Sequence, residues 1–352
     1  MSELTLSTAG INVAKRMLNA TQRQRDDFAE LQRANHYRKL DTETQYQIRD
    51  HDFGVRYVNA VEAYWRKEGR QVLAIHPDLL AEVRVATSAK VQPEIYRTIP
   101  FLSPMVVFAD PPKIQSWSSE DEVVQVIGFF IHGRSHNERF IAHELDQKLN
   151  DGELILSSHD PDMQKLGLVI VTEIFDKETG NSKTFEYNRT SLDMSKSQSI
   201  DEIANGLVQT YNWVDMGVGT GATRQSRESF LRNIYSLALG SIMYLCSTVL
   251  DAEVVPKSRI QRAQGKQRKP IKLTNIGWKI GPALSRLRRE HERGKKSIPT
   301  GRVMPPHMRR CHFRVVWTGS GRTIPKTVFI APHWVNRHLL ADDGPTTVRA
   351  VR

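Results

Sequence analysis

Residues 299–336 read PTGRVMPPHMRRCHFRVVWTGSGRTIPKTVFIAPHWVN. β-Branched and aromatic residues lie on both sides of the Gly-rich segment 318–321, a pattern that is typical of two strands joined by a tight turn. We therefore predict a β-ribbon, with one strand that ends at Trp317 and a second strand at 327–331. The residues that precede the ribbon are rich in arginine and histidine, which suit an anion better than an apolar core.

The positive charge of the chain is concentrated in this part of the sequence. The chain has 352 residues and a net charge of +11, but residues 253–326 alone hold 20 Lys and Arg against 3 Asp and Glu, a balance of +17. The rest of the chain therefore carries −6. A basic block with interleaved aromatic residues favours a nucleic-acid or ribosomal surface over a solvated tail. The residues that we expect to bind nucleic acid are Lys266, Arg268, Lys269, Arg286, Arg289, Arg309, Arg310 and Arg314.

Away from the ribbon, the hydrophobic pattern predicts three regions. Residues 1–95 are expected to be helical, and residues 96–255 to form an α+β core with a buried central helix. Residues 256–352 are expected to form a basic C-terminal module with a helix and the β-ribbon. The strands of the core have short, antiparallel-type connections, and they are predicted at 105–109, 123–131, 166–175 and 183–187. The predicted fold class is α+β, with a mostly antiparallel sheet flanked by N-terminal and central helices.

The central helix and the cysteine content indicate the cellular compartment in which we expect the protein. Residues 234–250 carry no charge, but this 17-residue segment contains five serine, threonine and glycine residues and is too short and too polar to span a membrane. The two cysteines, Cys246 and Cys311, give no disulfide framework, and the N-terminus lacks the apolar region of a signal peptide. We expect a cytoplasmic protein without a membrane partner, cofactor or metal.

Histidines in the basic region are the candidate acid–base groups, because histidine titrates near neutrality. A metal-independent endoribonuclease needs one histidine to take the 2′-hydroxyl proton, a second to protonate the leaving oxygen, and an arginine to stabilise the phosphorane. His307 and His312 are the candidates for these catalytic roles. A plain nucleic-acid-binding protein of plasmid or phage maintenance would carry the same residues, so the sequence assigns catalysis to no residue firmly.

The C-terminal motif resembles a known family. The run PHMRRCHFRVVWTG at 306–319 and the sequence PHWVN at 332–336 are similar to the C-terminal signature of a type V-A anti-CRISPR family. That signature is a Pro-His-x-Arg-Arg-Gly-His-Trp-His run, an aromatic-Trp-x-Gly close and a final Val-Asn. The matching positions are Pro306, His307, Arg309, Arg310, His312, Trp317, Gly319, Trp334 and Asn336.

Three positions depart from the family signature. Cys311, Phe313 and Arg314 stand where the family has glycine, tryptophan and a second histidine. Phe313 is a conservative change, whereas Arg314 replaces a titratable group. A lone histidine is a poor ribonuclease, so we do not expect an acid–base role at position 314.

The resemblance implies a function. The family acts on production of the effector nuclease and does not block the finished enzyme. Its members recognise the effector's emerging N-terminal polypeptide during translation, and the effector mRNA is lost. By this resemblance, the chain is an anti-CRISPR-like protein of a mobile genetic element in a bacterial cell. Its partners would be RNA or the ribosome and a nascent polypeptide, from a type V CRISPR effector or from another protein.

Overall fold

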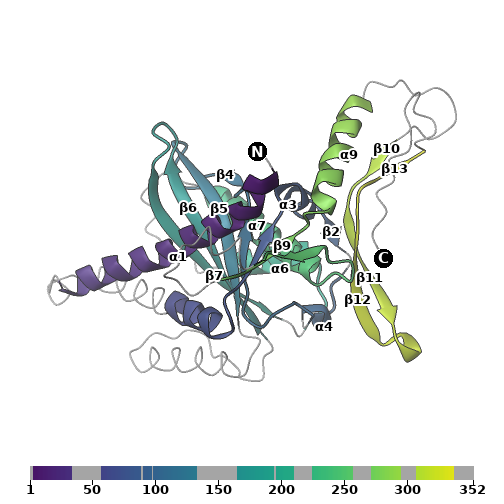
Figure 1. Cartoon of the computed structure of the whole chain (residues 1–352), viewed down its shortest axis with the longest axis horizontal. Helices are drawn as coiled ribbons and strands as arrows, with labels where there is room; N and C mark the ends of the chain where they lie inside the picture. Colours follow the sequence, from purple (N-terminus) through teal and green to yellow (C-terminus); the bar gives the residue numbers. More distant parts are fainter. Residues whose placement is uncertain are drawn as a thin grey trace.

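The computed structural model describes residues 3–33, 57–88, 90–96, 98–132, 165–193, 196–209, 224–256, 271–294 and 307–336. Its centre is a sheet in the order β7-β6-β5-β3-β1-β9-β8, with β4 paired to β5 (Figure 1). The strands are β1 (Gln71–Ile75), β3 (Met105–Phe108), β4 (Lys113–Gln115), β5 (Glu122–His132), β6 (Lys165–Asp176), β7 (Ser182–Asp193), β8 (Ala252–Val254) and β9 (Lys272–Ile276). Strand β1 is parallel to β3 and to β9, and the other pairs are antiparallel. The predicted α+β class with a mostly antiparallel sheet is confirmed.

Burial on both faces explains the sequence of the central strands. In β1, Leu73 and Ile75 are buried on one face of the sheet, whereas Val72 and Ala74 are buried on the other. Because neither face of these strands meets water, β1 and β3 read as continuous apolar runs and not as an apolar–polar alternation.

Helices cover both faces of this sheet. Helix α1 (Glu3–Arg33) and the helical segment 57–67 pack on one face, where Ile11, Met17 and Trp65 are among the buried residues. The other face is covered by α3 (Pro77–Val83), α4 (Pro93–Tyr96), α6 (Ile200–Gln209) and α7 (Arg224–Leu245). The sheet therefore has two cores, one on each side, and the C-terminal part of the chain joins the core on the α7 side.

Helix α7 is the predicted buried helix. Its C-terminal half is almost completely buried, but the helix ends at Leu245, before the end of the uncharged segment 234–250. It ends there because the next residues pair with another element: the N–H of Thr248 donates to the carbonyl of Thr327, 2.9 Å away. Within the described parts of the chain, no helix is both long enough and apolar enough to cross a membrane.

Helix α6 begins at a capping box, a reciprocal pair of side-chain caps. The hydroxyl of Ser199 accepts the N–H of Glu202 at 3.1 Å, and the carboxylate of Glu202 accepts the N–H of Ser199 at 2.7 Å. Two N–H groups that the first turn leaves without helical partners are thereby satisfied. These hydrogen bonds hold the pKa of Glu202 below its ordinary value.

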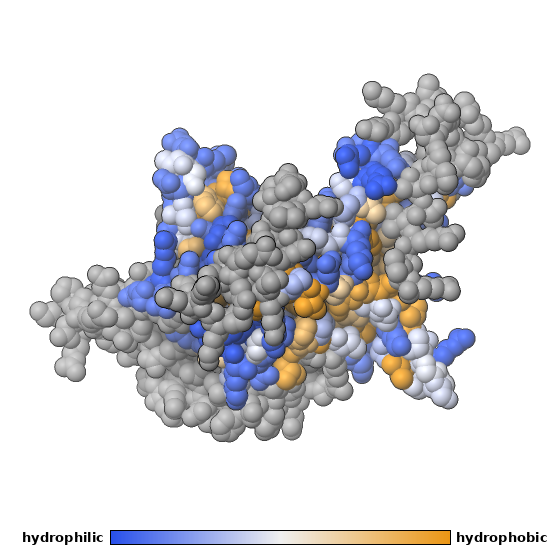
Figure 2. All heavy atoms as spheres, in the orientation of Figure 1, coloured by the Kyte–Doolittle hydropathy of each residue, from blue (hydrophilic) through white to orange (hydrophobic). Residues whose placement is uncertain are grey.

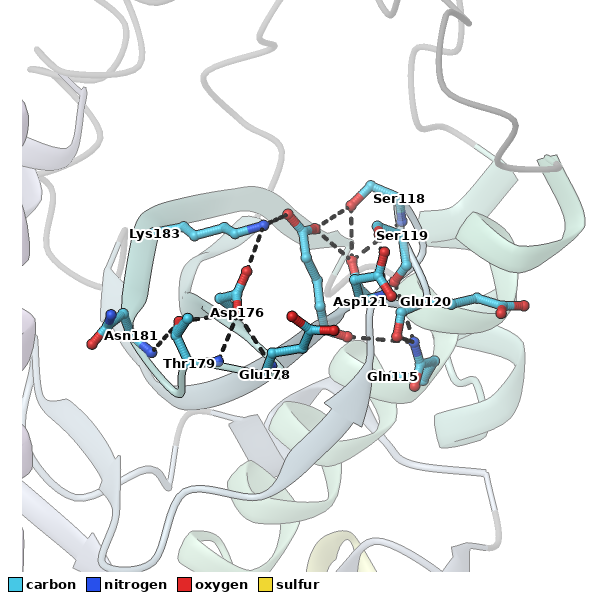
Figure 3. A network of polar contacts seen from close by, with 12 residues as sticks. Gln115, Ser118, Ser119, Glu120, Asp121, Asp176, Glu178, Thr179, Asn181 and Lys183 are labelled. Carbon is cyan, nitrogen blue, oxygen red and sulfur yellow. Dashed lines mark hydrogen bonds and ion pairs between the residues drawn. The ribbon is translucent and has the colours of Figure 1, made fainter.

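A polar network fixes the outer ends of β5, β6 and β7 (Figure 3). The Asp176 carboxylate accepts the N–H groups of Glu178 and Thr179 at 3.1 and 2.8 Å, and the bonds from Thr179 lower its pKa. Lys183 lies 3.1 Å from Glu122 and 3.4 Å from Asp176. Burial alone would raise the pKa of Glu122, but hydrogen bonds from Ser118 and Lys183 outweigh it and lower that pKa. The hairpin turn between the predicted strands 166–175 and 183–187 is therefore held by its own side chains.

Strands β1 and β9 lie inside the sheet, between β3 and the edge strand β8, and the sequence did not predict them. Strand β1 lies within the region 1–95 that was expected to be helical, and β9 lies within the predicted C-terminal module. Their residues pair in parallel from Gln71–Lys272 to Ile75–Ile276. Strands from all three predicted regions thus share one sheet, and the division at 95 and 255 stays a prediction.

Candidate functional site

A two-part β-ribbon lies beside the main sheet (Figure 1). Strands β11 (His312–Thr318) and β12 (Ile324–Ile330) pair antiparallel along their whole length. After a break of two residues on each strand, β10 (His307–Arg309) and β13 (His333–Val335) pair in the same way. The predicted ribbon is confirmed. Its turn contains a 3-10 segment, Ser320–Arg322, and Gly319 enters it at φ 80°, a conformation that glycine adopts without strain.

The inner face of β11–β12 is anchored to the core. The N–H of Phe329 donates to the Ser247 hydroxyl at 3.1 Å, and the Phe329 ring lies 5.2 Å from Tyr244 and 5.4 Å from Phe313. Cys311 is buried and its thiol donates to the Glu82 carbonyl at 3.0 Å. Burial raises the pKa of this thiol well above its ordinary value, so Cys311 is a packing residue and not a nucleophile.

Helix α9 (Ile280–Gly294) is fixed at both its N-terminus and its inner face. The Asp251 carboxylate accepts the N–H groups of Lys279 and Ile280 at 2.7 and 2.9 Å. A carboxylate therefore already occupies the helix N-terminus, which would otherwise favour a phosphate. On the inner face, Arg288 forms ion pairs with Asp78 and Glu82 of α3, so carboxylates of the protein itself already neutralise its charge.

The other predicted arginines of α9 and the ribbon are exposed. Arg286 and Arg289 lie on the solvent face of α9, because Leu284 and Leu287 occupy its buried face. Arg309, which was expected to precede the ribbon, lies within it in β10, and Arg310 and Arg314 follow it along the same chain. Among the described residues, the exposed arginines of this group form no ion pair, unlike Arg288. Figure 2 shows a hydrophilic surface over α9 above the more hydrophobic zone where the ribbon meets the body.

Of the remaining residues of the family motif, some contact other parts of the protein and others are exposed to solvent. The Trp334 ring lies 5.6 Å from the ring of His291, so β13 packs beside α9. Trp317 is 47% exposed. Asn336 follows β13 with φ 57°, which asparagine tolerates better than most residues. The other predicted residues, Lys266, Arg268, Lys269 and Pro306, lie outside the described residues.

The two candidate catalytic histidines do not share a position on the ribbon. His307 pairs with Val335 and His312 pairs with Ile330, so five residues separate them on both strands. In an extended ribbon this is roughly 16 Å, too far for both rings to reach one phosphodiester. The Nδ1 atom of His312 lies 3.4 Å from the Arg310 carbonyl, which suits a structural donor. The register disfavours a two-histidine centre, and intrinsic RNA cleavage stays a hypothesis.

An open hollow of about 670 Å³ lies along the ribbon. It is lined by Arg314, Val315, Val316, Trp317 and Arg322. Arg322, in the turn, was not singled out from the sequence, nor was the exposed Lys326, which stands opposite Val316 in the strand register. The register of the hairpin is the signal that would have found them, because it places Lys326 opposite Val316 and Arg322 in the turn that follows Thr318.

Comparison with models of known protein families shows to which family this chain is related. A family model, AcrVA2-like, the anti-CRISPR type V subtype A2 family, matches residues 73–337. The chain belongs to the AcrVA2-like family. The matched residues include α9, the whole ribbon and the main sheet apart from the first two residues of β1, so the family resemblance read from the C-terminal motif is confirmed over well more than half of the chain.

Two further comparisons complete this result. A crystal structure of AcrVA2 matches with 12% sequence identity and a TM-score of 0.42, over 94% of this chain and 99% of that chain. No curated protein matches this chain.

Proposed function

We propose that this AcrVA2-like chain is an anti-CRISPR protein of a mobile genetic element, which recognises a nascent polypeptide on the translating ribosome and lowers the mRNA of its target. One observation carries the proposal: exposed arginines without ion pairs in the described part gather on α9 and on a ribbon that the family match includes. The proposed site of action is the cytoplasm of the bacterial host, where translation takes place.

The arginines of α9 and β10 support the contact with RNA. Arg286 and Arg289 face solvent on α9, and the contact between His291 and Trp334 holds the ribbon beside that helix. Cations that need not first break an ion pair can bind phosphates and release counterions. Such contacts read the backbone and not the base sequence, so they fit ribosomal RNA or an mRNA in general.

Selectivity for one target then has to come from the peptide. A nascent polypeptide identifies its own gene while the mRNA is still in the same ribosome complex, so binding both partners would join recognition to loss of that mRNA. This arrangement needs no catalytic group in the protein, which agrees with the separation of His307 and His312 along the ribbon. Host nucleases would then remove the transcript.

A set of reporter genes tests this function. Each reporter begins with the N-terminal coding segment of a type V-A effector. In the first reporter the segment is in frame, and in the second a frameshift makes nearly the same nucleotides encode another peptide. In the third reporter an early stop codon interrupts the segment. With the protein present, we expect only the in-frame mRNA to fall. An equal fall of the frameshifted mRNA would contradict peptide recognition, and unchanged levels of all three would contradict the proposed function.

Incubation of the purified protein with labelled RNA in EDTA tests the origin of the RNA loss. We expect no cleavage, because the structure places the two histidines far apart. Metal-free cleavage that disappears in His312→Gln would instead support an endoribonuclease.

A further inference from the structure

Among the residues that the structure describes, strand β11 has an open edge. On one side it pairs with β12, and on the other it pairs with β2 (Thr87–Ser88) only at His312 and Phe313. From residue 314 to residue 318, no strand of the described chain borders this second side. In an edge strand, alternate residues turn their N–H and C=O groups outward, where they can pair with another extended chain.

The side chains along this edge differ between its two faces. Arg314 and Val316 lie on the outer face of the ribbon, where Lys326 stands opposite Val316. Val315 and Trp317 lie on the inner face, where Val315 packs against the core and Trp317 is 47% exposed. One face of the edge is therefore basic and the other is apolar, and the hollow of about 670 Å³ follows both of them.

We propose that an extended peptide with alternating acidic and apolar residues adds to β11 as a new strand. Its backbone would pair with residues 314–318, its acidic side chains would lie beside Arg314, with Lys326 one strand further away on the same face, and its apolar side chains would lie beside Val315 and Trp317. Strand addition takes its affinity from backbone hydrogen bonds and its selectivity from alternate side chains. The inference rests on the proposed function, in that the peptide is a segment of the nascent chain.

Two other occupants fit this edge less well. RNA would satisfy Arg314 and Arg322, but its phosphates offer acceptors without the donors that the outward carbonyl groups of β11 require. A second copy of this chain would bring the exposed cations Arg314, Arg322 and Lys326 of two ribbons together, and like charges at an interface are unfavourable. An acidic peptide meets both the charge and the open hydrogen-bonding groups.

Binding of designed probes to the full chain tests the inference. The probe is a fluorescein-labelled peptide of alternating Glu and Val, measured by fluorescence anisotropy. The comparison probes are a Lys–Val peptide, a Glu–Val peptide that is N-methylated at every second residue, and an oligouridine RNA. Among the peptides we expect only the unmodified Glu–Val peptide to bind, with slower hydrogen exchange of the amides of residues 314–318. The oligouridine, which the arginines of α9 and β10 are proposed to bind, should leave the exchange of those amides unchanged. Failure of this peptide to bind, or equal binding of the N-methylated peptide, would overturn the proposal.

Charge reversal locates the site. Arg314→Glu with Arg322→Glu should weaken binding of the Glu–Val peptide at least tenfold, whereas the control Lys113→Glu with Lys177→Glu, at exposed lysines outside the ribbon, should leave its Kd unchanged. Equal loss in both variants would contradict a site at this edge. Displacement of the peptide by oligouridine would favour RNA at the edge, and a concentration-dependent dimer in sedimentation that excludes the peptide would favour a second copy; either result would overturn the proposal.

The two proposals fail separately. If the peptide binds at the edge but the in-frame reporter mRNA does not fall, the proposed function is wrong and the edge site stands. If the reporter mRNA falls equally with the wild type and with the Arg314→Glu, Arg322→Glu variant, the edge site is wrong and the proposed function stands.

Discussion

The rings of His291 on α9 and Trp334 on β13 lie 5.6 Å apart, with 51° between their planes. This pair joins the helix that carries Arg286 and Arg289 to the part of the ribbon that carries Arg309. Trp334 is one of the residues that match the family signature, and its ring contact places β13 beside α9.

Replacement of Trp334 should loosen β10 and β13 without unfolding the main sheet. An aromatic pair contributes about 1 kcal/mol beyond its buried area, so Trp334→Ala should favour local opening roughly fivefold. Hydrogen exchange of the amides of residues 307–309 and 333–335 measures this opening. Trp317→Ala is the control, because Trp317 is 47% exposed and should leave those amides unchanged. Unchanged exchange in Trp334→Ala would show that the contact does not hold the ribbon.

Two glycines in helices should respond to alanine in opposite directions. A Cβ on Gly240 of α7 would lie 2.4 Å from the carbonyl oxygen of Val83, so Gly240→Ala must push α7 away from α3. Overpacking of this kind costs about 1–3 kcal/mol. Gly206 of α6 has no atom within 4 Å of such a Cβ, so Gly206→Ala should stabilise the helix by about 0.5–1 kcal/mol. Urea unfolding compares the two, and a stable Gly240→Ala protein would contradict the close approach of the helices.

His132 makes stability depend on pH. Its ring is buried at the end of β5, where its Nε2 atom lies 2.9 Å from the Tyr57 hydroxyl, and burial lowers its pKa from 6.5 to about 4. The folded chain therefore keeps this histidine neutral while the unfolded chain takes up a proton. The contribution of His132 is fully present above pH 6.5 and is lost as the pH falls toward 4, by about 3 kcal/mol in all. NMR titration checks the cause directly: ring resonances of His132 that titrate near pH 6.5 would contradict it.

Arg309 and Arg310 should matter for RNA binding and not for stability. Both are exposed and form no ion pair in the described part of the chain, so Arg309→Ala with Arg310→Ala should leave the Tm within a few degrees of the wild type. If each arginine contacts one phosphate, the slope of log K against log salt should fall by about 2 between about 50 and about 200 mM salt.

The matched control for this pair is Lys113→Ala with Lys177→Ala. These lysines lie on β4 and in the turn directly after β6, parts of the structure that are away from the ribbon in Figure 1, and their removal takes away the same charge. We expect the control to keep the salt slope of the wild type. A large loss of folding in the arginine variant would show that these arginines are structural.

Local signals in the sequence predicted much of this fold. The hairpin of the predicted strands 166–175 and 183–187 and the glycine turn of the ribbon join residues that are close together in the chain, so their patterns are visible in one sequence. Strands β1 and β9 could not be predicted in this way. They are short, and their pairing joins residues about two hundred positions apart, for which a single sequence carries no pattern.

The candidate site shows the same limit. Arg286, Arg288 and Arg289 are equivalent in the sequence, but only the structure shows that Arg288 is held by Asp78 and Glu82 while the other two face solvent. The histidines were likewise grouped by their closeness in sequence, and the ribbon register separates them. Tertiary partners decide which charges remain available for a ligand, and periodicity does not reveal those partners.

The most direct test of the account is the order of addition in a coupled transcription–translation reaction that makes a type V-A effector. The measured quantity is cleavage of a target DNA by that effector, with the protein added either before translation begins or after the effector is complete. We expect cleavage to be lost when the protein is present during translation and to be unchanged when the protein is added afterwards. Equal inhibition of the finished effector, or no inhibition in either order, would contradict it.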